Sequence, residues 1–399
     1  MNIKLRISKY DHEGRGVSRN NNKVVFVPGA IEGELVDANI IEDKKNFSIA
    51  KINKILEPSS LRCIPKCPYF DVCGGCTFQH IDLTNEEIIK EESVKDIIKK
   101  YAKLDINPIF ISSKEFYYRN KIELKIDNYN WGYYNTSSHD FISINECLIA
   151  KESINKIISN KDLFKIEKGS ITIRSNYNDE IIIKIETPNN YKIDIDSLSK
   201  ENKIIGIIVN NKLIYGEDNF IERVGGYLFK VNINSFFQIN LDILDRIFKI
   251  IGGKNLGNIV DLYCGVGTLG IATKKNKLYG IEIIPEAIKD AIFNAKINKQ
   301  YNNLYMLADS SKIKEIDEHI DTIIVDPPRS GLNKTTLNNI IYIKPDNIIY
   351  MSCNPITLAR DLNVIKDNYS IESFYILNMF PRTKHIESLV FLKRSKNDR

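Results

Sequence analysis

The 399-residue sequence lacks any apolar run that is long enough to cross a bilayer. Residues 1–11 alternate charged and apolar side chains, so the N-terminus also lacks the continuous apolar stretch of a signal peptide. We therefore expect a cytoplasmic protein without a membrane partner, and a monomer of two or three domains. Because the cytosol is reducing, its seven cysteines should remain thiols, and clustered ones indicate metal ligands or catalysts before disulfides.

The sequence also has little excess charge of either sign, since 56 basic and 51 acidic residues give a net charge of +5. That balance permits a nucleic-acid partner without indicating one. Residues 1–57 contain short strand-like segments separated by glycines, which is typical of a small barrel. Their basic residues would supply phosphate contacts, and the alternative is the solvated face of a small packing domain.

A dense group of cysteines follows this segment. A metal needs several ligands that converge on one point, and the adjacent Gly74 and Gly75 let the backbone turn tightly around it. The five-residue gap between Cys67 and Cys73 is short for a zinc ribbon, so an iron–sulfur cluster is favoured over zinc. A distant thiol completes the set, and Cys63 is left as a spare. The predicted ligands are Cys67, Cys73, Cys76 and Cys147.

Residues 58–230 are predicted to form a central α+β domain around this cysteine site. An amphipathic helix is expected at about residues 84–101, for which packing on the catalytic domain is one option. Several strand-like segments follow, separated by turns rich in Asn and Gly, and this pattern favours an antiparallel sheet. These segments include residues 121–126, 170–174, 180–185 and 203–210.

Residues 231–399 change to a strand, glycine loop, helix and strand pattern, which is typical of a Rossmann-like α/β domain. A G-x-G-x-x-G sequence at Gly265, Gly267 and Gly270 follows the strand-like residues 258–263. Such a loop lets a nucleotide-type cofactor approach the backbone at a helix N-terminus. By itself it fits NAD, or tight packing alone, equally well.

Three acidic residues favour S-adenosylmethionine (SAM) as the cofactor. Asp261 precedes the glycine loop, where it could meet the methionine ammonium group. Glu282 ends the next strand, where an acid can bind ribose hydroxyls, and Asp309 ends the one after that, where the adenine would reach. A SAM-dependent methyltransferase domain is therefore expected.

Two further motifs end strand-like segments of this domain. In the first, Asp326 opens an Asp-Pro-Pro-Arg sequence. Enzymes that methylate exocyclic amines commonly place an aromatic residue where Arg329 stands, so this motif disfavours amine methylation. RNA cytosine-5 enzymes usually carry a second cysteine within the motif, and this sequence has none there. In the second, Cys353 lies in Ser-Cys-Asn-Pro after an apolar strand, as a candidate nucleophile. The alternatives are that Asp326 caps a turn and that Cys353 is a buried structural thiol.

Uracil chemistry fits these motifs. Carbon-5 of uracil is too weak a nucleophile to take a methyl group unaided, and a thiolate that adds to carbon-6 converts the ring into an enolate. A general base must then remove the carbon-5 proton. Glu387 and His385 compete for this role, and chemistry alone does not choose between them.

Together the motifs resemble the RNA uracil-5 methyltransferase family, and in particular its longer members, which carry a TRAM domain and a four-iron cluster. The resemblance covers nearly the whole chain. The segments that carry it are residues 14–17 and 28–29, the four cysteines, and residues 236–240, 261–265, 326–329, 352–355 and 385–387.

The resemblance implies a role for each matching residue. Cys353 would be the nucleophile and Glu387 the base. Phe236 would stack near the flipped base, and Asp326 would also reach the uracil edge. Residues 1–57 would be an OB-like TRAM barrel that binds RNA, and the cysteines would hold a structural [4Fe-4S] cluster. The predicted SAM-binding residues are Gln238, Tyr263, Gly265, Glu282, Asp309 and Asp326.

The resemblance implies 23S ribosomal RNA as the substrate, because family members with both a TRAM domain and the cluster mostly act on large-subunit ribosomal RNA, and tRNA is the alternative. Two other classes of protein are the alternatives. A non-catalytic RNA-binding protein would have lost Cys353, Glu387 or the glycine loop, and all are present. A radical SAM enzyme would need a C-x3-C-x2-C triad, which residues 63–73 do not form.

Overall fold

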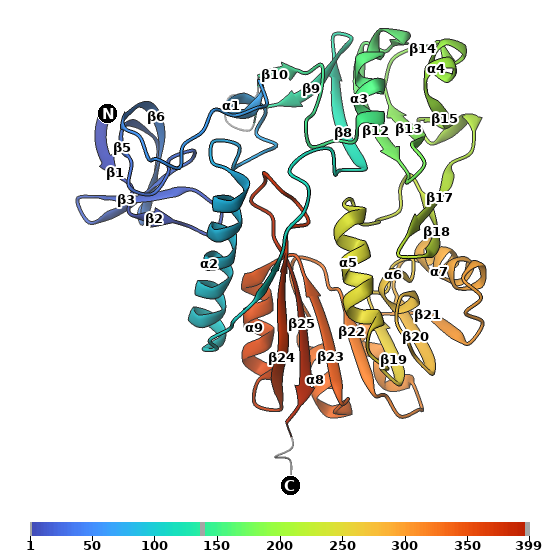
Figure 1. The fold of residues 1–399 in the computed structure, drawn as a ribbon. Coiled ribbons are helices and arrows are strands. Elements are labelled where there is room, and N and C mark those ends of the chain that lie inside the picture. The colour runs from blue at the N-terminus through green and yellow to red at the C-terminus, as the bar shows by residue number, and fades with distance from the viewer. Residues whose placement is uncertain (1, 136–139, 396–399) are drawn as a thin grey trace.

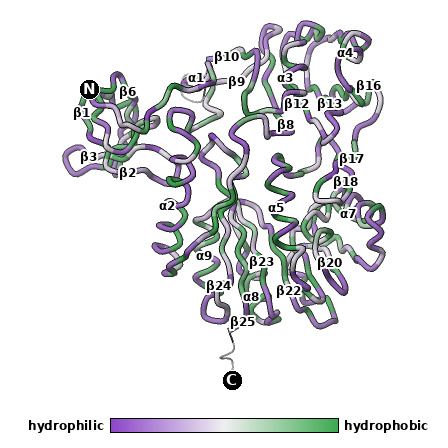
Figure 2. Tube along the Cα trace, in the orientation of Figure 1, coloured by the Kyte–Doolittle hydropathy of each residue, from purple (hydrophilic) through white to green (hydrophobic). Residues whose placement is uncertain are grey.

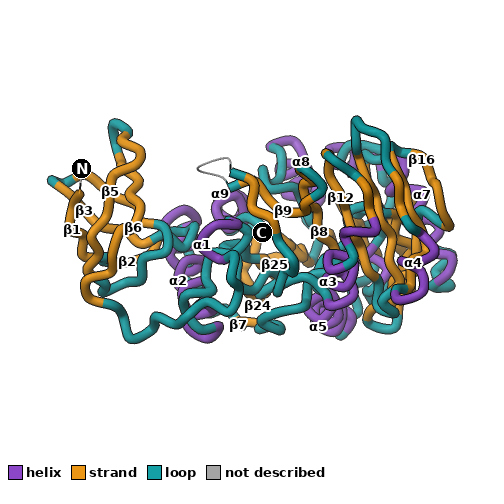
Figure 3. The backbone as a smooth tube through the Cα atoms, turned by 90° about the horizontal axis from the view of Figure 1, so that it is seen from above, coloured by secondary structure: helices purple, strands orange, loops and turns teal. Residues whose placement is uncertain are grey.

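The computed structural model describes residues 2–135 and 140–395. Figure 1 shows three parts: an N-terminal sheet domain, a central sheet, and a large α/β sheet that contains the C-terminus. Seen from above in Figure 3, the N-terminal domain lies at one end of the molecule and the central sheet toward the other. No helix in the described part of the chain is both long and apolar enough to cross a membrane.

The N-terminal domain is a small, strongly curved six-stranded sheet with the order β1-β5-β6-β4-β3-β2. Alternate residues of its strands, such as Val25 and Val27 or Val36 and Ala38, are buried in one core. This period of two is what a sheet with one covered face requires. Its strands are β1 (Asn2–Arg6), β2 (Lys9–Tyr10), β3 (Gly16–Asn20), β4 (Lys23–Val27), β5 (Leu35–Asp43) and β6 (Phe47–Glu57).

The central domain is a seven-stranded sheet covered by α3 (Glu152–Ser159) and α4 (Ile195–Glu201). It was predicted to be antiparallel, but β13 and β15 pair in parallel. The reason is that α4 lies between them in the chain and serves as the crossover connection. The strands of the sheet are β8 (Lys121–Asp127), β9 (Asn130–Tyr134), β10 (Phe141–Ser143), β12 (Lys168–Ser175), β13 (Glu180–Glu186), β15 (Lys203–Val209) and β16 (Lys212–Gly216). The short strands β11 (Phe164–Lys165) and β14 (Lys192–Ile193) pair separately.

The C-terminal domain is an eight-stranded sheet with the order β21-β20-β19-β22-β23-β25-β24-β7. Hydrophobic residues, green in Figure 2, run along its strands because helices cover both faces. Only β25 is antiparallel to its neighbours β23 and β24. The strands are β7 (Ile109–Ile111), β19 (Asn258–Leu262), β20 (Lys277–Glu282), β21 (Asn303–Leu307), β22 (Thr322–Val325), β23 (Asn347–Ser352), β24 (Tyr369–Leu377) and β25 (Glu387–Arg394).

Two helical layers cover this sheet. One layer contains α2 (Leu83–Ala102), α8 (Lys334–Ile343) and α9 (Pro355–Ile365), and the other contains α5 (Leu241–Gly252) and α6 (Thr268–Ile271). The helix α7 (Pro285–Ile297) lies beside α6 and β21. The resulting α/β architecture agrees with the predicted fold class.

Parts of the segment that was predicted as the central domain, residues 58–230, pack in the core of the C-terminal domain, as was allowed for the helix at about residues 84–101. The helix α2 buries Val94, Ile97 and Ile98 in the core of the C-terminal domain, and β7 extends its sheet beside β24. The hairpin of β17 (Asn219–Val224) and β18 (Tyr227–Asn232) contributes to the core on the opposite face. Segments that precede the C-terminal domain in the sequence therefore contribute apolar side chains to its core.

Candidate active site

Several predicted site residues lie at one edge of the C-terminal sheet. Tyr263, Asp326 and Cys353 directly follow the parallel strands β19, β22 and β23, and Glu282 is the last residue of β20. Because these strands are parallel and adjacent, their carboxyl ends meet at the same edge, where open α/β sheets bind ligands.

The glycine loop after β19 is held from two sides. Below it, Asp261 is 1% exposed, and its Oδ2 accepts a hydrogen bond from the Gly270 amide at 2.9 Å. Beside it, the Glu282 carboxylate accepts hydrogen bonds from the Gly265 amide at 3.0 Å and from two further backbone amides. Tyr263 has a left-handed φ of +60°, and a Cβ at Gly265 would meet nothing within 4 Å. The loop therefore turns sharply and leaves an open approach to its backbone.

Cys353 and Glu387 become neighbours through an antiparallel ladder. Ser352 at the end of β23 pairs with Ser388 of β25, so one step further along the register Cys353 lies beside Glu387. Glu387 is 5% exposed, and its Oε2 has no hydrogen-bond partner among the residues that the structure describes. A buried carboxylate oxygen without a partner is costly, and the Glu387 residue that carries it lines a pocket.

That pocket has a volume of about 1140 Å³ and brings together eight of the predicted catalytic, SAM-binding and substrate-binding residues. Gln238 is buried in its wall, whereas Phe236 is 75% exposed. The predicted residues that line it are Phe236, Gln238, Tyr263, Gly265, Glu282, Asp326, Cys353 and Glu387.

Comparison with known protein families gives matches to nearly the whole chain. The family described as tRNA (uracil-5-)-methyltransferase matches residues 84–395, and the TRAM domain matches residues 3–52. The chain belongs to the tRNA (uracil-5-)-methyltransferase family. The predicted resemblance is thus confirmed, and the protein is an RNA methyltransferase with an N-terminal TRAM domain.

Individual relatives agree with this assignment. An "uncharacterized RNA methyltransferase" of Aquifex aeolicus is 33% identical, over 98% of both chains. Another, of Clostridium acetobutylicum, is 32% identical over 98% of this chain and 96% of its own. Among solved structures, the Pyrococcus abyssi tRNA (uracil-54, C5)-methyltransferase in complex with S-adenosyl-L-homocysteine has a TM-score of 0.79 at 24% identity. The likeness covers 98% of this chain and all of that one, so the two share a fold throughout.

The electrostatics of this methyltransferase pocket are dominated by burial. Burial raises the pKa of Cys353 to about 11, and the nearby Glu387 and Asp326 add to the rise, while Arg329 opposes it. Burial also raises the pKa of Glu387 well above its ordinary range and that of Asp326 to about 7. His385 behaves oppositely: burial and the nearby Arg329 lower its pKa to about 4.

The raised pKa of Cys353 predicts a steep pH dependence of its alkylation. The thiolate reacts with iodoacetamide and the thiol does not, so the rate in the free protein should rise about tenfold per pH unit from pH 7 to pH 9. The positive sulfonium of bound SAM should shift this profile to lower pH by opposing the charges of Glu387 and Asp326. Mass spectrometry of the Cys353 peptide measures both profiles. A plateau below pH 9 in the free protein would contradict the prediction.

Two acids predicted to contact SAM lie elsewhere. Asp261 is not part of the pocket wall but fixes the start of α6 from beneath the glycine loop. Asp309 is exposed and also outside the wall, and its Oδ1 accepts a hydrogen bond from the Ser311 amide at 2.9 Å. That bond caps a short 3-10 helix, which explains why an acid follows β21.

The structure also brings unpredicted residues to the pocket. Arg119 lines it because its segment bridges to Asn240, and no local pattern in the sequence marks it. Lys230 from β18 and Phe380 from the loop before β25 line it as well. Phe380 opens the segment that contains His385 and Glu387, so its proximity to those residues in the chain was the available signal.

The predicted iron–sulfur ligands lie near one another in the central domain. The short helix α1 (Phe70–Cys73) ends at Gly74, whose left-handed φ of +72° turns the chain toward Cys76. Burial raises the pKa of Cys76 to about 12, with additional rises from the neighbouring Cys147, Cys73 and Cys67. The thiols of Cys147, Cys73 and Cys67 therefore lie near Cys76, although they come from two distant segments of the chain.

The structure does not itself show a metal site. Within residues 2–135 and 140–395, no group of three or more His, Cys, Asp and Glu side chains forms an arrangement that could hold a metal ion. Cys63 is exposed, and its Sγ lies 3.6 Å from the Gln79 carbonyl oxygen. The [4Fe-4S] cluster therefore stays a prediction.

Proposed function

We propose that this protein transfers a methyl group from SAM to carbon-5 of a uridine in RNA through a covalent intermediate on Cys353. The observation that carries the proposal is that Cys353 and Glu387 lie beside each other at the ends of paired strands and line one pocket. The glycine loop lines the same pocket, so one cavity can take both SAM, the methyl donor, and the uracil.

The reaction begins when the Cys353 thiolate adds to carbon-6 of the flipped uracil. The electron pair of the 5,6 double bond moves toward the carbonyl at carbon-4, which makes an enolate. Carbon-5 then attacks the sulfonium methyl group, and the electron pair of the broken sulfur–carbon bond stays on sulfur. The positive charge of SAM favours the thiolate, because it offsets the acids that raise the pKa of Cys353.

Glu387 completes the reaction as the general base. It takes the carbon-5 proton, whose bonding electrons restore the double bond and expel the Cys353 thiolate. Burial raises the pKa of Glu387, so the carboxylate is a stronger base than an ordinary one once it is ionised. The pKa of about 4 makes His385 the weaker base, which supports the choice of Glu387.

The remaining pocket residues bind and orient the reactants. We assign SAM binding to Gln238, Tyr263, Glu282 and the Gly265 backbone, and we assign Asp326 to both SAM and the uracil edge. Phe236 is exposed at the pocket, where its ring can stack on a base that has left the RNA helix.

The four cysteines would hold a [4Fe-4S] cluster that fastens α1 to the loop around Cys147. A four-iron cluster is held by four Cys thiolates, which is the number of cysteines in this set. Such a cluster would supply structural cross-linking here rather than electron transfer.

The RNA target is assigned to large-subunit (23S) ribosomal RNA from the domain content, a TRAM domain together with a cysteine site. The second candidate is tRNA, because the full-length fold likeness includes an enzyme that acts on tRNA. The test incubates the purified protein and methyl-labelled SAM with ribosomal RNA and tRNA in separate reactions. Nucleoside analysis should find 5-methyluridine in the ribosomal RNA. Label in tRNA alone would reverse the choice of target, and no 5-methyluridine in either RNA would refute the proposed reaction.

A further inference from the structure

The loop of residues 378–386 determines where the catalytic base points. It connects β24 to β25, it carries Phe380 and His385 in the pocket wall, and it leads directly into Glu387. Because Oε2 of Glu387 has no hydrogen-bond partner among the described residues, packing rather than a hydrogen bond sets the direction of that oxygen. Glu387 pairs with Leu377 of β24 at the start of β25, so the sheet holds its backbone and the loop that leads into it shapes the packing around its side chain.

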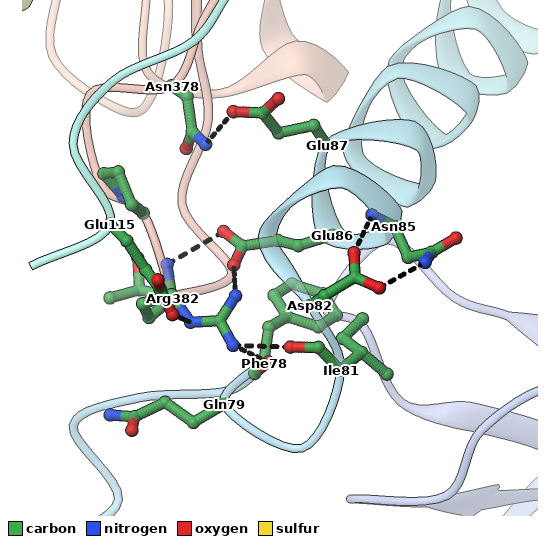
Figure 4. A network of polar contacts seen from close by, with 12 residues as sticks. Phe78, Gln79, Ile81, Asp82, Asn85, Glu86, Glu87, Glu115, Asn378 and Arg382 are labelled. Atoms are coloured by element: carbon green, nitrogen blue, oxygen red, sulfur yellow. Dashed lines mark hydrogen bonds and ion pairs between the residues drawn. The ribbon is translucent and has the colours of Figure 1, made fainter. Parts of the chain in front are cut away.

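Arg382 fixes the middle of the loop from the side away from the pocket. It is 2% exposed and has a left-handed φ of +68°, a conformation that a bulky residue adopts only when its surroundings impose it. Figure 4 shows its side chain directed at Glu86 of α2, where Nη1 donates to Oε2 at 2.9 Å and the Arg382 amide donates to Oε1 at 2.8 Å. The network thus joins the first turn of α2 to the catalytic loop.

The same residue is bonded to the segment that follows Cys76. The Arg382 carbonyl accepts hydrogen bonds from the amides of Thr77 at 2.7 Å and Phe78 at 3.0 Å. Its Nη2 donates to the carbonyls of Phe78 at 2.8 Å and Ile81 at 2.5 Å, as Figure 4 shows. One side chain and its own peptide groups therefore link the cysteine segment to the loop before Glu387.

Lys90 and Tyr118 hold the neighbouring positions of the loop. The Lys90 Nζ donates to Glu86 Oε1 at 2.7 Å, to Asn378 Oδ1 at 2.9 Å and to the Phe380 carbonyl at 3.2 Å. The Tyr118 hydroxyl donates to the Pro381 carbonyl at 2.9 Å. Buried ion pairs contribute little net stability relative to apolar residues, and in several proteins they serve to specify one geometry. This network is therefore suited to positioning.

We infer that Arg382 is a positioning residue, which holds the 378–386 loop between α2 and the turn after Cys76 so that Glu387 faces Cys353. This inference rests on the proposed function and deepens it, because it makes the cysteine segment and the catalytic base one mechanical unit. Cys353 itself is held by β23 and α9, outside this network.

The test measures where the reaction stops in Arg382→Met. Methyl transfer needs only Cys353 and SAM in place, whereas release of the product needs Glu387. The variant should therefore accumulate a covalent protein–RNA adduct that survives denaturing gels, with kcat lowered about 10- to 100-fold and the KM for SAM unchanged. Arg394→Met removes an exposed ion pair at the far end of β25 and is the matched control, which should behave as wild type.

Further variants separate positioning from general loss of structure. Tyr118→Phe removes a single hydrogen bond to the loop and no charge, and it should show the same adduct at a lower level. If circular dichroism shows that Arg382→Met is unfolded, this variant tests the positioning role instead. Cys76→Ser should also accumulate adduct. Activity lost in proportion to SAM binding, or lost without adduct in these variants, would overturn the inference. A wild-type protein that never forms adduct or 5-methyluridine would instead refute the proposed function.

Discussion

Replacing Cys353 by alanine is expected to lower methyl transfer to RNA by on the order of 10⁴-fold or more, to the limit of detection. Without the thiolate no enolate forms, and carbon-5 is then too weak a nucleophile to attack the sulfonium methyl group. SAM binding should be preserved, because the glycine loop and Glu282 are held by contacts that do not involve Cys353. Single-turnover transfer of labelled methyl groups and calorimetric titration with SAM measure the two effects.

The matched control for this prediction is Cys63→Ala. Cys63 is exposed and outside the pocket, so its loss should leave the rate close to that of wild type. A Cys353→Ala variant that kept even a hundredth of the wild-type rate would exclude covalent catalysis through this residue. The assignment of the pocket to a cysteine-dependent uracil methylation would then have to be abandoned.

Replacing Glu387 by glutamine is expected to stop the reaction at a later step. Addition of Cys353 and methyl transfer would still occur, but the carbon-5 proton would remain, because an amide is not a base. We expect turnover to fall about 10²- to 10⁴-fold and a methylated covalent adduct with the RNA to accumulate. Denaturing gels with RNA and SAM labelled separately show whether the adduct carries the methyl group.

His385→Gln provides the control for the choice of base. Its imidazole lines the same pocket but has a pKa lowered to about 4, so its removal should not trap the adduct. Adduct accumulation in His385→Gln, with normal turnover in Glu387→Gln, would reverse the two assignments. In Glu387→Gln the new side chain is similar in size to glutamate, so that variant loses only the ionisable group.

Much of the site could be predicted from the sequence because it lies at strand ends. Glu282, Asp326 and Cys353 end or directly follow apolar strands, and parallel strands of one sheet bring their carboxyl ends together. The spacing of the three glycines predicted the loop, since glycines allow the sharp turn and the close approach of a cofactor to the backbone. The same logic placed Asp309 at this edge, but its side chain turns outward to cap a helix, and a strand-end position does not determine side-chain direction.

By itself, the sequence determined the class of fold, the family and the residue types available for uracil chemistry, because these depend on local periodicity and on short motifs. Only the tertiary structure decided which of them meet. Glu387 lies beside Cys353 because β25 pairs antiparallel with β23, and Arg382 joins the cysteine segment to the catalytic loop although about 300 residues separate them. Contacts between distant segments depend on how helices and strands pack, and neighbouring residues in a chain do not specify that packing.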